Sequence, residues 1–212
     1  MEKKFVKEMD IDKVANYKRP HMILLSGFPG SGKTYVAKAL SKKYQLFLLS
    51  NDYVRNYCFS HNEEVSSVEP IEMIVKRINK QRLLKLLNNK KSFIFDRDIN
   101  TNEEMKKFIL LSKTFGYDLI AIKLNSNDKN NIERVENRFM DIDKVDKDIV
   151  GDNVEYSTSF TSSTYFKIKE RKPRNIDDDY FDYVIDNNGT LENLDEQLEN
   201  IMDDMSYHLK KR

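Results

Sequence analysis

A glycine-rich run between an apolar stretch and a helical pattern constrains the fold of this chain more than any other feature. The apolar stretch covers 22–25, and the helical pattern begins at Lys33. The run consists of Gly27, Phe28, Pro29, Gly30, Ser31, Gly32, Lys33 and Thr34. This G-x-x-x-x-G-K-T spacing is typical of a P-loop, in which backbone N–H groups and a helix N-terminus surround a phosphate. The sequence therefore predicts that these eight residues bind a nucleoside triphosphate.

Two residues of this run have more specific predicted roles. The ammonium group of Lys33 is expected to reach the β- and γ-phosphates, and the hydroxyl group of Thr34 is expected to bind Mg²⁺. The alternative is a glycine-rich turn that matches the motif by chance. Because a strand pattern precedes the run and a helix pattern follows it, the context favours the P-loop.

Composition limits the setting of the protein. The chain has 212 residues, 39% of them hydrophobic, so it can bury the core of one domain over 21–212, with 1–20 as an N-terminal extension. The net charge of +1 gives no overall field for a membrane surface or for nucleic acid. With one cysteine, Cys58, no intramolecular disulfide can form, and the absence of a long apolar stretch leads us to expect a cytoplasmic protein. Cys58 is expected to be a buried apolar residue.

Apolar runs alternate with helical patterns along the rest of the chain. Strands are predicted at 22–26, 45–50, 92–95, 119–124 and 183–185, and helices at 33–44, around 71–78, at 102–115 and from 191. This alternation indicates a mainly parallel five-stranded sheet with helices on both faces, a three-layer α/β/α sandwich of the P-loop NTPase class. Ligands bind such sheets beyond the carboxyl ends of the strands.

Asp52 and Arg55 follow the second predicted strand, three residues apart. One helical turn separates them, so both can face one pocket. A kinase needs a carboxylate to orient or deprotonate the attacking hydroxyl group and a cation to hold an anionic part of the acceptor. The alternative is that Asp52 only caps a helix and that Arg55 is solvated.

The third predicted strand stops abruptly at Asp96. This carboxylate is a candidate to bind Mg²⁺ or to steady the acceptor. Asp98 and Asn100 follow, and the alternative for them is to cap a helix that begins near Thr101.

Two later segments complete the predicted site. Arg134 and Arg138 lie four residues apart on a predicted helix, where they are candidates to close over the nucleotide; the alternative is a surface helix with ion pairs to neighbouring glutamates. They begin a predicted mobile lid insertion at about 134–175, whose central part has little hydrophobic periodicity. After the fifth strand, Asn188 and Gly189 form a turn that leads to an N-cap at Thr190.

Together these motifs resemble P-loop kinases of the polynucleotide 5′-kinase and zeta-toxin type, over about 22–205. The resemblance implies that Asp52 is the base for the acceptor hydroxyl group and that Arg55 holds an acceptor phosphate. It also implies that Asp96 and Asn100 contact the acceptor, although Arg97 and Asp98 depart from the usual residues between them. The segment 181–194 is similar to the last strand and loop of nucleoside monophosphate kinases and dephospho-coenzyme A kinase. This similarity implies ATP as donor, with Asn188 and Gly189 beside the adenine.

The sequence therefore predicts an ATP- and Mg²⁺-dependent kinase that acts on a hydroxyl or phosphate group of a small molecule, a nucleotide or a polynucleotide 5′-end. The alternative is a non-catalytic or regulatory P-loop ATPase that acts through a protein partner. A nucleic-acid acceptor would need a basic groove, for which one predicted helix offers Lys76, Arg77, Lys80, Arg82 and Lys85. A GTPase and an ABC-type ATPase are disfavoured, because their signature segments are absent from the sequence. The acceptor and the oligomeric state are left open.

Overall fold

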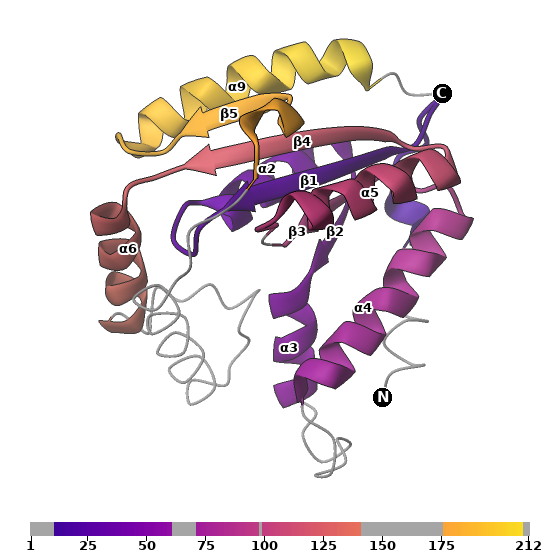
Figure 1. Ribbon diagram of the computed structural model, residues 1–212, viewed down its shortest axis with the longest axis horizontal. Coiled ribbons are helices and arrows are strands. Elements are labelled where there is room, and N and C mark those ends of the chain that lie inside the picture. The colour runs from indigo at the N-terminus through magenta and orange to yellow at the C-terminus, as the bar shows by residue number, and fades with distance from the viewer. Residues whose placement is uncertain (1–10, 61–70, 98, 141–175, 210–212) are drawn as a thin grey trace.

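The computed structural model describes residues 11–60, 71–97, 99–140 and 176–209 (Figure 1). These residues contain five strands: β1 (His21–Gly27), β2 (Phe47–Ser50), β3 (Phe93–Asp96), β4 (Asp118–Asn125) and β5 (Tyr183–Asp186). They pair in parallel in the order β2-β3-β1-β4-β5. The predicted parallel sheet of five strands is confirmed, with β1 at its centre.

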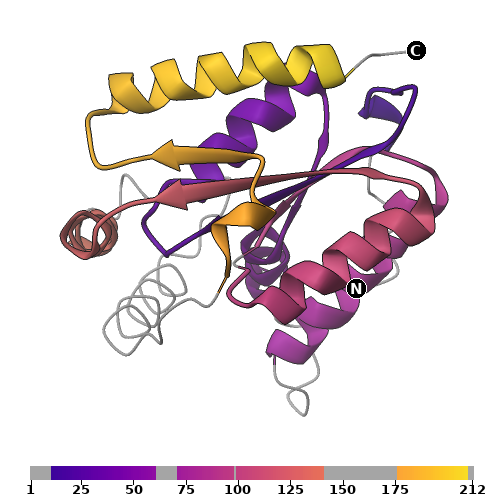
Figure 2. The same ribbon diagram turned by 45° about the horizontal axis from the view of Figure 1, so that its top comes forward.

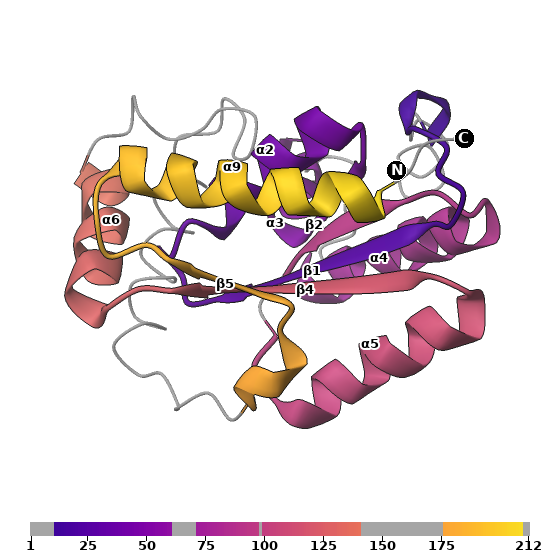
Figure 3. The same ribbon diagram turned by 90° about the horizontal axis from the view of Figure 1, so that it is seen from above.

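Helices cover both faces of the sheet (Figure 2). Helices α2 (Lys33–Tyr44) and α9 (Leu191–His208) lie on one face, and α4 (Ile71–Asn88) and α5 (Asn102–Phe115) lie on the other. Figure 3 shows α9 and α5 on opposite sides of β4. Helices α3 (Asn51–Ser60) and α6 (Asp128–Met140) follow the carboxyl ends of β2 and β4, and short 3₁₀ turns occupy Ile11–Lys13 and Asp178–Tyr180. The predicted three-layer α/β/α sandwich is thus confirmed.

The central strand explains why the two faces have separate cores. All seven residues of β1 are buried, and successive side chains point to opposite faces. Ile23 and Leu25 join the core under α2 and α9, whereas Met22 and Leu24 join the core under α4 and α5. A third, smaller core joins α3 to α4, and the buried Cys58 belongs to it, as predicted.

Local signals set the starts of two helices. Thr190 caps α9 through a capping box with Asn193, which confirms the predicted N-cap. Helix α5 is capped by Thr101, whose hydroxyl oxygen accepts from the N–H of Glu104. The alternative that Asn100 caps this helix is therefore wrong, and Asp98 lies outside the described residues.

The described part of the predicted N-terminal extension packs on the domain. Val14 and Tyr17 are buried, and the Tyr17 hydroxyl group donates to the carbonyl oxygen of Tyr44 at the end of α2. Burial raises the pKa of Tyr17 to about 12. The predicted lid at 134–175 overlaps α6, but its larger part lies outside the described residues.

Candidate active site

The P-loop, residues 27–34, lies at the carboxyl edge of the sheet and divides it into two sides. It follows the central strand β1, which has β4 as one neighbour and β3 as the other. We call the ends of β4 and β5 with α6 the β4–β5 side, and the ends of β2 and β3 with α3 and α4 the β2–β3 side. The register pairs Ser50 with Asp96, so the residues after β2 and β3 emerge next to each other.

Two positions of the P-loop require glycine, both because of their backbone conformation and because there is no space for a side chain. Gly30 and Gly32 have φ values of 84° and 95°, in the left-handed region that favours glycine. A Cβ atom on Gly30 would lie 2.6 Å from the carbonyl oxygen of Asn131, and one on Gly32 would lie 2.6 Å from Nδ2 of Asn187. Larger residues would therefore push the loop away from α6 and from the turn after β5.

Lys33 and Thr34 contact groups within and beside the loop. The Lys33 ammonium donates to the carbonyl oxygens of Gly27, at 2.5 Å, and Phe28, at 2.9 Å. The Thr34 hydroxyl group donates to Oδ2 of Asp96 at 3.1 Å. The structure thus brings together the two residues that the sequence predicts as Mg²⁺ ligands.

This pair fits a magnesium ion by its chemistry. Mg²⁺ prefers oxygen ligands and takes one or two from the protein, with phosphate and water oxygens as the others. In the part of the chain that the structure describes, no group of three or more His, Cys, Asp or Glu side chains forms a complete metal cage. The hydroxyl and carboxylate oxygens of Thr34 and Asp96 therefore suit a metal that arrives with a nucleotide.

On the β4–β5 side, Arg134 reaches the P-loop from α6. Its guanidinium group donates to the carbonyl oxygen of Gly30 at 3.3 Å, and to the carbonyl oxygen and Oδ1 of Asn187 at 3.0 and 3.2 Å. The alternative of a purely surface arginine does not predict these contacts. The backbone of Arg138 lies in α6, one turn further on, and its side chain is outside the described residues.

Asn187 is a site residue that the sequence analysis missed. Its side chain is buried, and its Nδ2 donates to the carbonyl oxygen of Ser31 at 2.9 Å. It therefore joins the turn after β5 to both the P-loop and Arg134. The sequence analysis selected Asn188 and Gly189 from this polar turn instead, because the local sequence does not indicate a contact between residues 156 positions apart.

The predicted base-side residues lie next to this junction. Asn188 accepts from the N–H of Asn127 at 2.7 Å, so it links the turn to the start of α6. It also lines a hollow of about 280 Å³ together with Phe28, Lys123, Leu124, Asn125, Ser126 and Asn127. Gly189 packs against Asn193, where a Cβ atom would lie 2.7 Å from Oδ1. Asn188 and Phe28 thus border a space beside the P-loop.

On the β2–β3 side, Asp52 and Arg55 form an ion pair within α3. Ser50 occupies the N-cap position, where its Oγ accepts from the N–H of Tyr53 at 3.5 Å, so Asp52 is free of the capping role proposed as its alternative. Arg55 is 12% exposed, not solvated as that alternative required. Its Nε and Nη2 also donate to Glu72 at 2.6 and 3.1 Å, across to α4. Glu72 was missed because nothing near it in sequence indicates this contact.

The residues after β3 form a second ion pair. Arg97 lies 3.3 Å from Oε1 of Glu104, and its guanidinium group lies over the rings of Phe95 and Phe108. Asn100 is exposed, and its N–H donates to Oε2 of the same glutamate at 2.9 Å. Asp96 and Asn100 therefore differ in setting, since Asp96 contacts Thr34 whereas Asn100 contacts the start of α5.

The position of Arg82 contradicts the expectation of one basic helix face that could serve as a nucleic-acid groove. Its side chain is buried, with the rings of Phe47 and Tyr53 5.1 and 5.7 Å from its guanidinium carbon. It donates to Asn79, which in turn donates to Asn51, and burial lowers its pKa to about 10. Lys76, Arg77 and Lys80 are exposed on α4. The five cations thus do not share one face.

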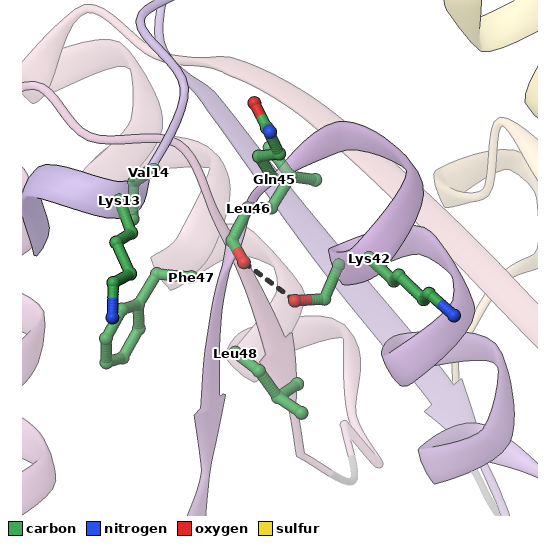
Figure 4. Close-up of a pocket in the computed structure, with 8 residues that line it drawn as sticks. Lys13, Val14, Lys42, Gln45, Leu46, Phe47 and Leu48 are labelled. Atoms are coloured by element: carbon green, nitrogen blue, oxygen red, sulfur yellow. Dashed lines mark hydrogen bonds between the residues drawn. The ribbon is translucent and has the colours of Figure 1, made fainter. Parts of the chain in front are cut away.

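A larger hollow has a volume of about 470 Å³ (Figure 4). It is lined by Lys13, Val14, Ser41, Lys42, Gln45, Leu46, Phe47 and Leu48. These residues lie around the end of α2 and the start of β2, whereas the P-loop precedes the start of α2. This hollow is therefore not part of the candidate active site. Within the described ranges, every helix is too short or too polar to cross a lipid bilayer.

Solved structures share this fold. A candidate kinase from Chloroflexus aurantiacus is 17% identical with a TM-score of 0.61, over 91% of this chain and all 100% of that one. A chain of the PezAT chromosomal toxin–antitoxin system of Streptococcus pneumoniae is 16% identical with a TM-score of 0.58, over 98% and 93%. APS kinase of Mycobacterium tuberculosis, in complex with AMPPNP and APS, is 14% identical with a TM-score of 0.52, over 87% and 96%.

Of two sequence comparisons, one finds a family for this chain and one finds no match. A search of curated proteins finds no match to this chain. The sequence model of the AAA domain family AAA_33 matches residues 22–154, which is more than half of the chain and includes the P-loop, Asp52 and Asp96. The predicted resemblance to the P-loop kinase group is confirmed. The chain therefore belongs to the AAA_33 family of AAA domains.

Proposed function

We propose that this protein is a kinase that uses ATP and Mg²⁺ to phosphorylate a hydroxyl group of its acceptor. The observation that carries the proposal is the hydrogen bond between Thr34 and Asp96. It joins the P-loop helix to the end of β3, and the neighbouring strand β2 leads directly to Asp52. Groups suited to a phosphate, a metal and an acceptor hydroxyl group therefore meet at one edge of the sheet.

Residues of the P-loop and the β4–β5 side would hold ATP. Lys33 and the loop amides bind the phosphates, and the ammonium leaves its carbonyl partners for phosphate oxygens. Arg134, already against Gly30, adds positive charge next to the loop. The hollow beside Phe28 and Asn188 has room for part of the nucleoside. Arg138 remains a predicted lid residue.

Residues on the β2–β3 side would take part in binding the metal ion and would act on the acceptor. Thr34 and Asp96 would hold Mg²⁺, and a bound Mg²⁺ would supply positive charge that offsets the negative charge on the transferred group. Asp52 would accept the proton of the acceptor hydroxyl group as the hydroxyl oxygen forms a bond to the γ-phosphorus. At the same time the bond between the γ-phosphorus and the β-phosphate oxygen breaks, and ADP leaves. The carboxylate is 39% exposed, so an acceptor can reach it.

A transfer assay tests this proposal directly. The protein is incubated with γ-labelled ATP, Mg²⁺ and a library of metabolites and oligonucleotides, and the labelled products are identified by mass spectrometry. Calorimetry with AMPPNP and Mg²⁺ measures binding separately. A labelled acceptor supports the kinase. Binding and slow hydrolysis without any labelled acceptor would favour the regulatory ATPase instead.

A further inference from the structure

The turn after β5 contains a dipeptide that can react with itself. Asn188 is followed by Gly189, and no other asparagine in the sequence precedes a glycine. The side-chain amide of an asparagine can be attacked by the backbone nitrogen of the next residue. A glycine leaves that nitrogen the most accessible, because glycine has no side chain and its backbone moves freely. Both residues are exposed, so water reaches the dipeptide.

Two hydrogen bonds polarise the side-chain amide of Asn188. Its Oδ1 accepts from the N–H of Asn127 at 2.7 Å, and its Nδ2 donates to Oδ1 of Asp186. When a nucleophile adds to Cγ, negative charge develops on Oδ1, and a backbone N–H that already donates to this oxygen stabilises the charge. Nδ2 is the atom that would leave. It lies next to the exposed Asp186, so that ammonia has a short path to solvent.

The reaction needs no reagent other than water. The backbone nitrogen of Gly189 forms a bond to Cγ of Asn188, the bond between Cγ and Nδ2 breaks, and Nδ2 leaves as ammonia with the proton of the Gly189 N–H. The product is a five-membered succinimide ring. Water then opens the ring at one of its two carbonyl carbons. Opening at Cγ gives aspartate, and opening at the backbone carbonyl carbon gives isoaspartate, in which the main chain runs through the side-chain methylene group.

Both products would disturb the turn that holds the P-loop. In aspartate, a carboxylate oxygen replaces the Nδ2 that donated to Asp186, so two negative charges face each other. In isoaspartate, the main chain gains one methylene group directly after Asn187. Asn187 donates to the carbonyl oxygen of Ser31 and lies next to Gly32. A longer or repelled turn would therefore move the residue that joins β5 to the P-loop.

We propose that Asn188 is a site of spontaneous deamidation and that its conversion weakens the binding of a nucleoside triphosphate to the P-loop. Molecules that have aged would then bind the nucleotide more weakly than newly made ones. The deamidation itself is independent of the proposed kinase function, whereas its effect on the nucleotide rests on that function.

The first experiment measures the rate of deamidation in the full chain. The protein is kept at 37 °C and pH 8 for several days, and peptide mapping by mass spectrometry follows aspartate and isoaspartate at each asparagine. Asn125 is the internal control, because it is also exposed, lines the same hollow and precedes Ser126. We expect Asn188 to react at least about tenfold faster than Asn125, because glycine has no side chain. Equal rates at the two positions would overturn the proposal.

The matched variant is Asn188→Gln, which keeps an amide but would have to form a six-membered ring, a slower reaction. Gly189 is left unchanged, since a Cβ atom there would lie 2.7 Å from Oδ1 of Asn193. We expect the variant to stay intact at position 188 while Asn125 reacts as it does in the wild type. If the variant does not fold, the comparison of Asn188 with Asn125 in the wild type still decides the proposal.

The second experiment links deamidation to nucleotide binding. Calorimetry with AMPPNP and Mg²⁺ compares each aged sample with its own fresh sample. Converted wild-type molecules should bind AMPPNP about tenfold more weakly, because the turn no longer holds the P-loop, and aged Asn188→Gln should keep its own fresh affinity. An equal loss in the variant, or full affinity in the converted wild type, would overturn the link. If fresh protein does not bind AMPPNP, the proposed kinase function fails, and the mass spectra still decide whether Asn188 deamidates.

Discussion

Two sides of one P-loop place the same residue type in opposite electrostatic settings. Arg134 donates to the carbonyl oxygens of Gly30 and Asn187, which are uncharged acceptors. Arg55 forms ion pairs with two carboxylates, those of Asp52 and Glu72. The difference shows that an arginine near a P-loop does not by itself indicate an anion site. Its partners decide whether it attracts a phosphate or only joins two helices.

The largest expected effect comes from the P-loop, which both sides share. Lys33→Ala is predicted to lower the rate of phosphoryl transfer by about a thousandfold, because the variant lacks the ammonium group that stabilises the developing charge. The protein should stay folded, since other hydrogen bonds also hold the loop backbone that Lys33 contacts, among them those from the N–H of Ser31 to Phe28 and from the N–H of Val36 to Gly32. Transfer kinetics and circular dichroism measure the two properties. Lys43→Ala, exposed at the other end of α2, is the control, and full activity in Lys33→Ala would reject the mechanism.

A change on the β2–β3 side should affect transfer and spare ATP binding. Asp52→Asn keeps the shape of the side chain but cannot accept the proton, so kcat is predicted to fall about a hundredfold. The affinity for AMPPNP, measured by calorimetry, should stay within error of the wild type. Asp203→Asn, on the exposed surface of α9, is the control. An equal loss of AMPPNP affinity would show that Asp52 supports the structure and would remove the functional difference between the two sides.

A change on the β4–β5 side should have the opposite pattern. Arg134→Ala and Asn187→Ala are each predicted to weaken AMPPNP binding by about tenfold, because the P-loop loses hydrogen bonds from α6 or from the turn after β5. The double variant should lose less than the product of the two, since the residues contact each other. Calorimetry measures all three, with Arg19→Ala as the control. Additive losses would mean that the two residues act independently.

The smallest effect is expected far from both sides, at His21 on the amino edge of the sheet. Burial lowers its pKa below 6.5, although Asp118 opposes that shift and His208 adds to it. The unfolded chain therefore binds more protons as the pH falls below about 6.5, and the folded state loses stability there. Urea unfolding at pH 7.5 and 5 should show a smaller loss for His21→Gln than for the wild type. AMPPNP affinity should be the same in both proteins at pH 7.5.

Features carried by neighbouring residues could be predicted from the sequence. The P-loop is one continuous motif between a strand and a helix, and the alternation of strands and helices fixed the parallel sheet. The ends of parallel strands gather at one edge, so Thr34 and Asp96 were expected to meet there, and they do. The roles of Asp52, Arg55 and Asn100 toward an acceptor stay predictions.

Features that depend on packing could not be predicted. Glu72 and Asn187 contact residues 17 and 156 positions away, and local spacing holds no record of such distances. Arg82 was counted with exposed cations because its charge suggests solvent, yet its long planar side chain stacks well between aromatic rings. Helical periodicity alone does not distinguish these two surroundings.

The buried amide of Asn187 has a consequence for anyone who shortens this protein. A fragment that stops before β5 would retain every letter of the phosphate-binding motif, and a sequence scan would still report it intact. It would lack Asn187, which lies next to Gly32 and donates to the carbonyl oxygen of Ser31, 156 positions earlier in the chain. We expect such a fragment to contain the complete P-loop motif and yet not to bind a nucleotide.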